Sequence, residues 1–245
     1  MQRILYALFL AVSFAFAAPA SADPHDFEQC RQLFADQSPP VILQPKAKET
    51  RALCFSAFAV LHSGQSRTPL YVAEKLNRKT LQAAHEKRKD KFFADARLPR
   101  AERAELDDYK GSGYDRGHMA PAADMSTPES MAQSFSLANM VPQAPANNRK
   151  TWAKIEKSTR QYVMRAKGDV YVITGPVFNA TPATIGNNRV WVPQQLFKLV
   201  YDPSANKAWA HWIDNQDLSK AGKPISYEEL VKRTGIDFIR NYQGG

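Results

Sequence analysis

The most regular pattern in this chain is a series of residues at helical spacing in the second half of the sequence. Its members recur three or four positions apart, as the residues on one face of a helix do, and they are Trp152, Ile155, Thr159, Tyr162, Val163 and Ala166. Gly168 follows the last of them and is a natural C-cap. The pattern therefore predicts one long amphipathic helix that the rest of the fold has to cover on one side.

Strand-like segments precede and follow this helix. An apolar run at residues 52–61 is suited to a buried strand, and residues 71–73 suit a second, short one. Further strand signals come after the helix, at residues 170–174, 190–192, 196–201 and 208–213. The segment 84–108 is dense in charge and contains Pro99, which indicates a loop or a solvated helix.

Two capping boxes predict further helices. Ser126 with Glu129 precedes a helix over residues 128–136, and Ser226 with Glu229 opens one that ends before Gly235. The order along the chain is then strands, helices, strands and a helix. This order favours an α+β fold, with a largely antiparallel central sheet flanked by helices, over alternating βαβ units.

Composition limits the class of protein. With 245 residues, 44% of them hydrophobic and 23% charged, the chain has the balance of a globular protein that can bury a full core. It contains 33 Lys and Arg residues against 24 Asp and Glu residues, a formal charge of +9. This excess points toward polyanionic partners, although it is only weak evidence taken alone.

The N-terminal segment has the form of a secretory signal. Arg3 supplies a positive charge, residues 4–17 are apolar, and Ala20-Ser21-Ala22 fits the small-x-small cleavage pattern. Cleavage leaves residues 23–245 as a single domain, with no stable membrane association and a secreted or periplasmic location. An uncleaved membrane anchor is the alternative interpretation of residues 1–22.

The two cysteines, Cys30 and Cys54, are expected to form a disulfide, because export exposes them to an oxidising compartment. Closing a loop of that size stabilises a fold by about 3–4 kcal/mol in the chain-entropy model. Two buried thiols are the alternative. The absence of a Cys-x-x-Cys pattern argues against a metal or redox site.

Among the histidines, His118 has surroundings that suggest acid–base chemistry. It follows Asp115-Arg116-Gly117 after a glycine-rich hinge, and a glycine beside it allows close backbone approach by a ligand. The other histidines lie near the N-terminus, at a strand end, in a charged segment or among tryptophans. Each of these four is interpreted as a surface residue or a hydrogen-bonded core residue.

Asn148, Trp152 and Glu156 lie four residues apart, roughly on one helical face. An amide oxygen is a hard ligand of the kind that Mg²⁺ accepts, although Asn148 at the head of a helix also suits capping. Asn148 and Glu156 are about 12 Å apart along a straight helix, so both cannot bind one ion directly. Glu156 would then act through water, or form a surface salt bridge with Arg160.

Together these motifs carry a family resemblance. Tyr114-Asp115-Arg116-Gly117-His118, then Asn139-Met140-Val141-Pro142-Gln143, then Asn148, Trp152 and Glu156 resemble the DNA/RNA non-specific endonuclease family, of the ββα-metal class. The similarity extends to residues 172–176 and 232–235 and covers most of residues 55–240. These motifs, in this order and spacing, are far more specific together than any one of them alone.

The resemblance implies a ββα-metal nuclease fold and a metal site. His118 would be the general base that activates the attacking water. Asn148 would be the direct protein ligand of a single Mg²⁺, for which Mn²⁺ can substitute. Glu156 would hold water of that ion.

The resemblance also implies contacts to the substrate. Arg116 would contact the phosphate or stabilise its developing charge, and Asn139 would position either the His118 strand or the phosphate. The family's upstream phosphate-binding arginine corresponds to Arg88, with Arg97 as the alternative. Phe135 stands in the neighbourhood where the family often has a further asparagine, so that supporting contact is not expected here.

The resemblance thus implies a secreted, Mg²⁺-dependent endonuclease that cuts DNA and RNA with little sequence preference and leaves 5′-phosphate ends. It also allows a homodimer and an inhibitor protein as partners. The alternative from another class is a non-catalytic nucleic-acid-binding protein of the envelope, for instance in DNA uptake. That protein would bind in a salt-sensitive way without cleavage.

Overall fold

The computed structural model describes residues 27–43, 49–240 and 242–244. The predicted signal segment, residues 1–22, lies outside this part of the chain, so its cleavage stays a prediction. Within the described part, no helix combines the length and the apolar character needed to cross a membrane.

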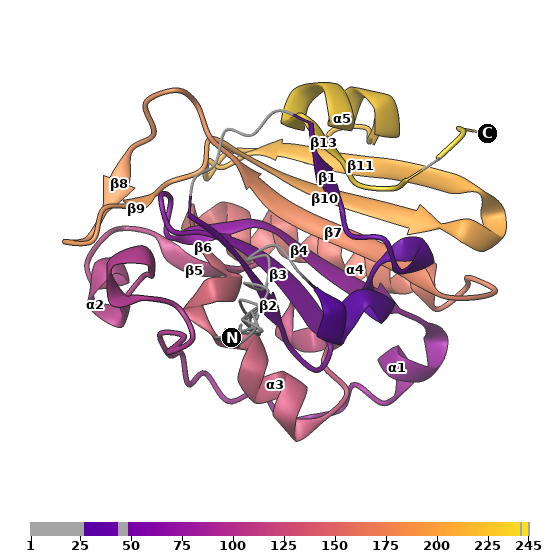
Figure 1. The fold of residues 1–245 in the computed structure, drawn as a ribbon, viewed down its shortest axis with the longest axis horizontal. Helices are drawn as coiled ribbons and strands as arrows, with labels where there is room; N and C mark the ends of the chain where they lie inside the picture. The colour runs from indigo at the N-terminus through magenta and orange to yellow at the C-terminus, as the bar shows by residue number, and fades with distance from the viewer. Residues whose placement is uncertain (1–26, 44–48, 241, 245) are drawn as a thin grey trace, which may run out of the picture.

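A seven-stranded sheet forms the centre of the fold, with every neighbouring pair of strands antiparallel. In spatial order its strands are β12 (Ile225–Ser226), β11 (Lys207–Asp214), β10 (Gln195–Asp202), β7 (Val170–Val177), β4 (Thr68–Leu76), β3 (Phe58–Ser63) and β2 (Thr50–Cys54). This sheet and the helices beside it confirm the predicted α+β class (Figure 1).

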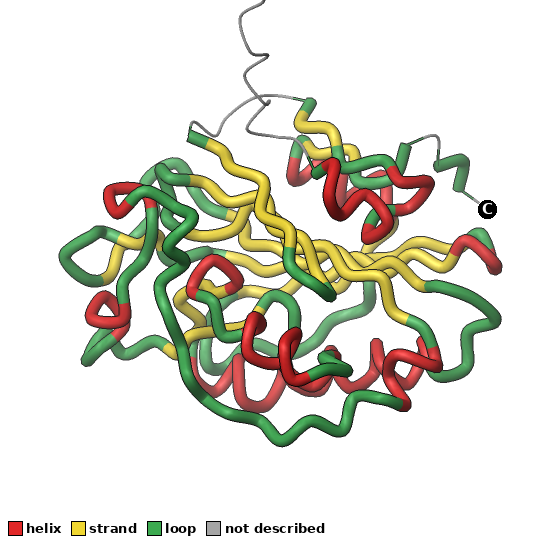
Figure 2. The backbone as a smooth tube through the Cα atoms, turned by 60° about the horizontal axis from the view of Figure 1, so that its bottom comes forward, coloured by secondary structure: helices red, strands yellow, loops and turns green. Residues whose placement is uncertain are grey.

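Helices and smaller strand pairs surround the sheet. The α-helices are α1 (Arg78–Gln82), α2 (Leu106–Tyr109), α3 (Pro128–Ser134), α4 (Ala153–Val163) and α5 (Tyr227–Thr234). The two-stranded pairs are β1 (Val41–Ile42) with β13 (Ile236–Asp237), β5 (Asp115–His118) with β6 (Met140–Gln143), and β8 (Thr184–Ile185) with β9 (Val190–Trp191). Figure 2 shows helices on both sides of the strands.

The two faces of the sheet bury separate apolar layers because successive side chains of a strand point to opposite faces. Val72, Val172 and Val200 belong to the layers on the side of α4. Ala73 and Leu199 belong to the opposite layer, which α5 and the N-terminal residues Phe27–Phe34 cover. The strands are therefore apolar on both faces, and the central helix covers only one of them.

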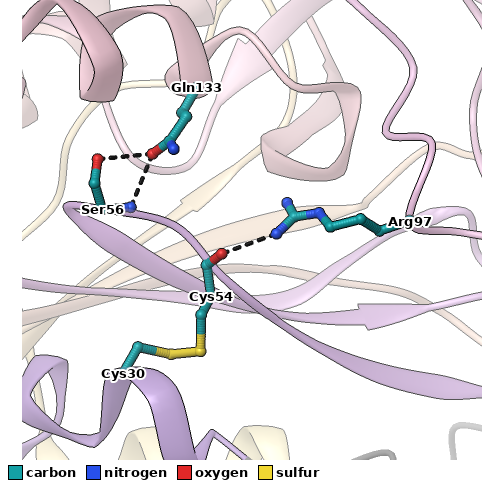
Figure 3. Close-up of a disulfide and its surroundings, with 5 residues drawn as sticks. All are labelled: Cys30, Cys54, Ser56, Arg97 and Gln133. Carbon is teal, nitrogen blue, oxygen red and sulfur yellow. Dashed lines mark hydrogen bonds between the residues drawn. A yellow bond between two sulfur atoms is a disulfide. The ribbon is translucent and has the colours of Figure 1, made fainter.

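The predicted disulfide between Cys30 and Cys54 is confirmed, with 5.7 Å between the two Cα atoms. It joins the N-terminal 3₁₀ segment, Glu28–Leu33, to the end of β2 (Figure 3). The Cys54 carbonyl accepts a hydrogen bond of 2.9 Å from the Arg97 guanidinium. The crosslink thus ties the layer on the α5 side to the loop that carries Arg97.

Removing the disulfide is expected to destabilise the fold. Replacing both Cys30 and Cys54 by Ala should lower the free energy of unfolding by about 3 kcal/mol, because the unfolded chain gains conformational freedom. Urea denaturation measures this, with chemically reduced wild-type protein as the matched control. A denaturation midpoint that does not move would contradict the expectation.

Several predicted element boundaries are wrong. The apolar run 52–61 is not one strand: it turns at residues 55–57, so that β2 and β3 form a hairpin in which the Phe55 N–H bonds to the Phe58 carbonyl. Ser56, at this turn, is exposed. Its N–H and its hydroxyl both donate to the side-chain oxygen of Gln133 (Figure 3). Apolar periodicity cannot reveal such a turn, because both strands are buried.

The helix ends also differ from the prediction. The capping box before α3 is formed by Thr127 and Ser130, one residue later than predicted, and α3 ends at Ser134. Helix α4 ends at Val163, so Gly168 is not its C-cap. Helix α5 confirms its predicted N-cap, Ser226, and ends before Gly235, whose φ of 69° is the left-handed conformation that glycine adopts readily.

The remaining differences concern extent rather than type. The short strand predicted at residues 71–73 is the middle of β4, which has nine residues. The charged segment 84–108 is mainly loop, with a 3₁₀ turn at Arg100–Glu102 and the start of α2.

Candidate active site

A cleft of about 600 Å³ opens where the β5–β6 pair meets the start of the central helix. The structure brings most of the sequence-predicted residues together there, and those that line the cleft are Arg88, Arg116, His118, Asn148 and Glu156. They come from the loop after α1, from β5, and from the helical segment that follows β6. A loop, strand β5 of an antiparallel pair and a helical segment thus hold these side chains around one opening.

His118 ends β5, where it pairs with Met140 of β6. Its ring packs edge-on against Phe135, with 5.1 Å between ring centroids, and lies 5.8 Å from the Phe92 ring. Burial, together with the positive charge of Arg88, lowers the pKa of His118 to about 3. The imidazole is therefore neutral at physiological pH and can accept a proton.

Gly117 has a different role from the one expected. A Cβ atom there would lie 2.6 Å from the Cβ atom of Gln143, whose side chain is buried beside the β5 backbone. The close approach that this glycine permits is thus made by β6 of the same chain rather than by a ligand. The effect is to bring the two strands together and fix the position of His118.

Asn139 holds the backbone that follows His118. Its side chain accepts a hydrogen bond from the Ala120 N–H and donates to the carbonyls of Ala120 and Ser134, each at 2.9 Å. It is fully buried and does not line the cleft. Of the two roles left open for it, positioning of the His118 segment fits this geometry and contact with phosphate does not.

Asn148 faces the cleft with its amide oriented by Asp115. Its Nδ2 donates to an Asp115 carboxylate oxygen at 2.9 Å, and Arg149 bonds both oxygens of the same carboxylate at 2.8 and 2.6 Å. Burial alone would raise the pKa of Asp115, but the hydrogen bonds from Arg149 and Asn148 outweigh it and lower that pKa. With its nitrogen bound to a carboxylate, Asn148 presents its Oδ1 as the atom available to a cation.

The helix does not begin as predicted. Residues Asn147–Trp152 wind as a π-helix, whose N-cap is Ala146, and α4 follows it. Asn148 is therefore not a capping residue, and the capping alternative is wrong. Trp152 points into the core rather than into the cleft, so Asn148, Trp152 and Glu156 do not share one face. Such wide turns are frequent at functional sites.

Glu156 lines the cleft but does not pair with Arg160. Arg160 instead donates to Asp124 at 2.9 Å, so the predicted surface salt bridge is wrong. Burial raises the pKa of Glu156 to about 7, against the lowering effect of Lys198. The carboxyl therefore titrates near neutral pH when no metal ion is bound.

The cleft contains Arg88 and Arg116 and leaves Arg97 outside. The Arg116 guanidinium lies over the Phe92 and Tyr109 rings and donates to the Leu106 carbonyl at 3.1 Å. Arg88 pairs with Asp90 at the cleft wall.

Arg97 pairs with the buried Asp95 at 2.7 Å and covers the Phe55 ring. Of the two arginines considered for phosphate contact, Arg88 is thus the one that the fold places in the cleft.

Comparison with known protein families identifies the family of this chain. The model of the DNA/RNA non-specific endonuclease family matches residues 40–243, which is most of the chain. The chain belongs to this family. The predicted family resemblance is therefore confirmed, and the protein is a member of a family of metal-dependent nucleases.

Individual nucleases of the family are similar over much of the chain. It is 32% identical to a nuclease of Nostoc sp., over 75% of this chain and 71% of that protein. It is 34% identical to mitochondrial endonuclease G of Homo sapiens, over 66% of this chain and 55% of that protein. The chain thus spans little more than half the length of the human enzyme.

A solved structure has the same fold. The chain matches a crystal structure of an EndoG/EndoGI complex with a TM-score of 0.70 and 26% identity, over 80% of this chain and 89% of that one. The α+β architecture derived above is therefore that of an endonuclease of this family.

The residues of the cleft fit the hydrated metal ion that such a nuclease uses. Within the described ranges, no three His, Cys, Asp or Glu side chains are grouped to enclose a metal. What the cleft offers is a neutral amide oxygen, that of Asn148, and a carboxyl, that of Glu156. A small divalent cation that keeps most of its waters suits this donor set, as Mg²⁺ does.

The sequence reasoning missed Asp115 and Arg149, which orient Asn148. Asp115 was noted only as a neighbour of His118 in the motif. The sequence contains one signal for Asp115. Because side chains alternate along a strand, Asp115 points to the same side of β5 as Gly117 and away from Arg116. Its partner Arg149, however, is 34 residues away in the sequence, and only the β5–β6 pairing brings the two together.

Proposed function

We propose that this protein is a Mg²⁺-dependent endonuclease that hydrolyses DNA and RNA with little sequence preference and leaves 5′-phosphate ends. Mn²⁺ is the proposed substitute ion. The observation that carries the proposal is the convergence of a neutral imidazole, an oriented amide oxygen and two arginines on one cleft. These are a proton acceptor, a cation ligand and phosphate-binding groups.

His118 is the proposed general base. Its Nε2 is buried and has no hydrogen-bond partner among the described residues, which leaves Nδ1 as the nitrogen that can face the cleft. A neutral imidazole there takes the proton from the attacking water. Arg88 favours this neutral form, because a nearby positive charge opposes protonation of the ring.

Asn148 is the proposed metal ligand, and Glu156 is proposed to hold water of the ion. When bound, a divalent cation supplies positive charge that neutralises the phosphate and stabilises the departing oxygen. Asp115 and Arg149 keep the Asn148 amide turned with its oxygen outward. Asn139 keeps the backbone after His118 in place.

Arg116 and Arg88 are proposed to bind the phosphate of the substrate. Arg116 is held by aromatic rings and a backbone carbonyl, so its guanidinium loses little freedom on binding. Phosphate contacts carry no base information, and broad specificity follows from a site built on them. RNA is accepted if the cleft tolerates a 2′-hydroxyl.

A secreted or periplasmic location is also proposed. The signal-like residues 1–22 and the Cys30–Cys54 disulfide both support it, since disulfides persist mainly in oxidising compartments. An inhibitor protein is a proposed partner, because the matching crystal structure is described as an EndoG complex that explains EndoG inhibition. A homodimer stays a prediction.

The test of this function is cleavage of supercoiled plasmid and of RNA by the purified protein, with Mg²⁺ or with EDTA. We expect both substrates to be cut with Mg²⁺ and neither with EDTA. Salt-sensitive binding without cleavage, across several divalent ions, would instead support the alternative, a non-catalytic nucleic-acid-binding protein of the envelope.

A further inference from the structure

The loop that follows β11 lies against the segment that carries Asn148. This β11 loop comprises residues 215–219, and none of them lines the cleft. The segment that it contacts comprises residues 144–152 and connects β6 to α4. The loop is far from this segment in the sequence, so only the folded structure brings the two together.

Asn215 uses both ends of its side-chain amide in this contact. Its Oδ1 accepts a hydrogen bond of 2.8 Å from the Ala144 N–H. Its Nδ2 donates to the Pro142 carbonyl at 2.9 Å and to the Pro193 carbonyl at 3.0 Å. Asn215 is buried, and one side chain thus joins β6, the residue that follows β6, and the connection that leads to β10.

Ala144 connects Asn215 to Asn148. The Ala144 N–H is bound by the Asn215 side chain, and the Ala144 carbonyl accepts a hydrogen bond of 2.9 Å from the Asn148 N–H. Ala144 is itself buried. Two hydrogen bonds, with one residue between them, therefore link the side chain of Asn215 to the backbone of the candidate metal ligand.

Asp217 contacts the first turn of the same segment. Its Oδ1 accepts a hydrogen bond of 2.7 Å from the Ala146 N–H. The first N–H groups of a helix have no partner within the helix, and the N-cap residue, Ala146, has no polar side chain to supply one. Asp217 therefore provides, from a distant loop, an acceptor that the start of the helix itself lacks.

Two side chains of the segment bond to the end of β11 and to the β11 loop. Asn147 is fully buried and donates to the Asp214 carbonyl at 2.7 Å, and Thr151 donates to the Ser219 carbonyl at 3.1 Å. Neighbouring residues of a helix project in different directions. With the Asn147 amide bound on the side of β11, the next residue, Asn148, faces the cleft.

The π-helical form of residues 147–152 gives these contacts their importance. Such turns are rare and short, so the contacts around the turn have to hold its position. A metal ligand also depends on outer partners that orient it. Asp115 orients the Asn148 side chain, while the β11 loop bonds to the backbone from which that side chain projects.

We propose that Asn215 and Asp217 are positioning residues for Asn148, whose backbone they hold at the cleft through hydrogen bonds to the residues that precede it. The inference rests on the proposed function, in which Asn148 is the metal ligand. Neither Asn215 nor Asp217 lines the cleft, so neither touches the substrate or the ion.

The first test observes Asn148 in the metal-free protein, through the NMR signal of its ¹⁵N-labelled side-chain amide. Comparison with Asn148→Ala assigns the signal. In the wild-type protein this amide is bonded to Asp115 and should exchange slowly with water. We expect Asn215→Ala to shift the signal and to speed the exchange, because the backbone before Asn148 loses its anchor. An unshifted signal in folded Asn215→Ala would overturn the proposal.

Asn77→Ala is the matched control for lost stability. Asn77 also uses both ends of its amide, which donates to Asp169 at 2.8 Å and accepts from the Thr80 N–H at 2.9 Å, and it lies outside the cleft. Both variants should lower the thermal midpoint, but only Asn215→Ala should shift the Asn148 signal. An equal shift in Asn77→Ala would mean that the whole fold has loosened, and it would overturn the proposal.

Asp217 keeps the proposal testable where Asn215→Ala fails to fold, because Asp217 is exposed. Asp217→Ala should shift the Asn148 signal. Asp217→Asn should leave it in place, because asparagine also accepts a hydrogen bond at the start of a helix. Equal shifts in the two variants would trace the effect to the charge of Asp217, which acts on Arg149, and no shift in either would exclude any effect. Both outcomes would overturn the role of Asp217.

Binding of Mn²⁺ alone supplies an independent readout. Titration of the metal-free proteins, followed by the EPR signal of the free ion, should show about tenfold weaker binding by Asn215→Ala and unchanged binding by Asn77→Ala. Equal Kd values for Asn215→Ala and wild type would contradict the proposal. Failure of the wild-type protein to bind Mn²⁺ or to cleave nucleic acid would reject the proposed function, while the metal-free NMR signal would still decide the role of the β11 loop.

Discussion

Replacing His118 by Ala is expected to abolish cleavage while leaving the protein folded. Positioned proton transfer contributes about 10²–10⁴-fold to a rate, and no other described histidine lines the cleft to supply it. The lost imidazole leaves a small gap between Phe92 and Phe135, so a modest fall in the thermal midpoint is expected. Single-turnover cleavage of plasmid, with thermal denaturation beside it, measures both effects.

The matched control for His118 is His85, which lies in the charged loop after α1 and outside the cleft. His85→Ala should cleave like the wild-type protein. Cleavage at the wild-type rate by His118→Ala would remove His118 from the mechanism. Loss of activity accompanied by unfolding would call for His118→Gln, which keeps more of the packing but cannot act as a base.

Replacing Asn148 by Ala is expected to lower Mg²⁺-dependent cleavage by about 100-fold or more, since even residues that only orient a metal ligand are worth 10–100-fold. The variant removes the amide oxygen and leaves the Asp115–Arg149 ion pair in place. Cleavage measured against Mg²⁺ concentration should show weakened metal dependence, with partial recovery at high Mg²⁺.

Lys154→Ala is the control for Asn148, because Lys154 is exposed on the same helical segment. Equal losses in the two variants would mean that Asn148 only shapes the start of the helix. Asp115→Asn tests the orientation of the amide, since it weakens the hydrogen bond that turns the Asn148 nitrogen away from the cleft. We expect that variant to lie between wild type and Asn148→Ala.

The sequence predicted the class of fold because its signals are local. The spacing of Ile155, Thr159 and Val163 follows from the buried side of α4, and these residues are indeed buried. Gly235 ended α5 as its backbone conformation requires. The turn at residues 55–57 was missed because strands that are apolar on both faces give one continuous hydrophobic run.

The candidate site was predictable in its members and not in its contacts. His118, Asn148 and Glu156 stand in motifs, and the cleft contains all three. The π-helical turn before α4 has no periodic signal in the sequence. The prediction that Trp152 shares a helical face with Asn148 and Glu156 was wrong for this reason.

Glu74 and Lys198 lie within strands that read as apolar runs. Both residues pair with the same strand, β7. Lys198 is opposite Thr174, and Glu74 is opposite Val172, which lies far from it in the sequence. Sequence pattern alone contains no signal for such a juxtaposition.

The most direct test of the central claim is hydrolysis of a defined DNA duplex in ¹⁸O-labelled water with Mg²⁺, followed by mass analysis of the product ends. Water activated by His118 and attacking phosphorus should place one ¹⁸O on the new 5′-phosphate and leave a 3′-hydroxyl, with no labelled product from His118→Ala. Label on a 3′-phosphate, or the same labelled product from His118→Ala, would contradict the account.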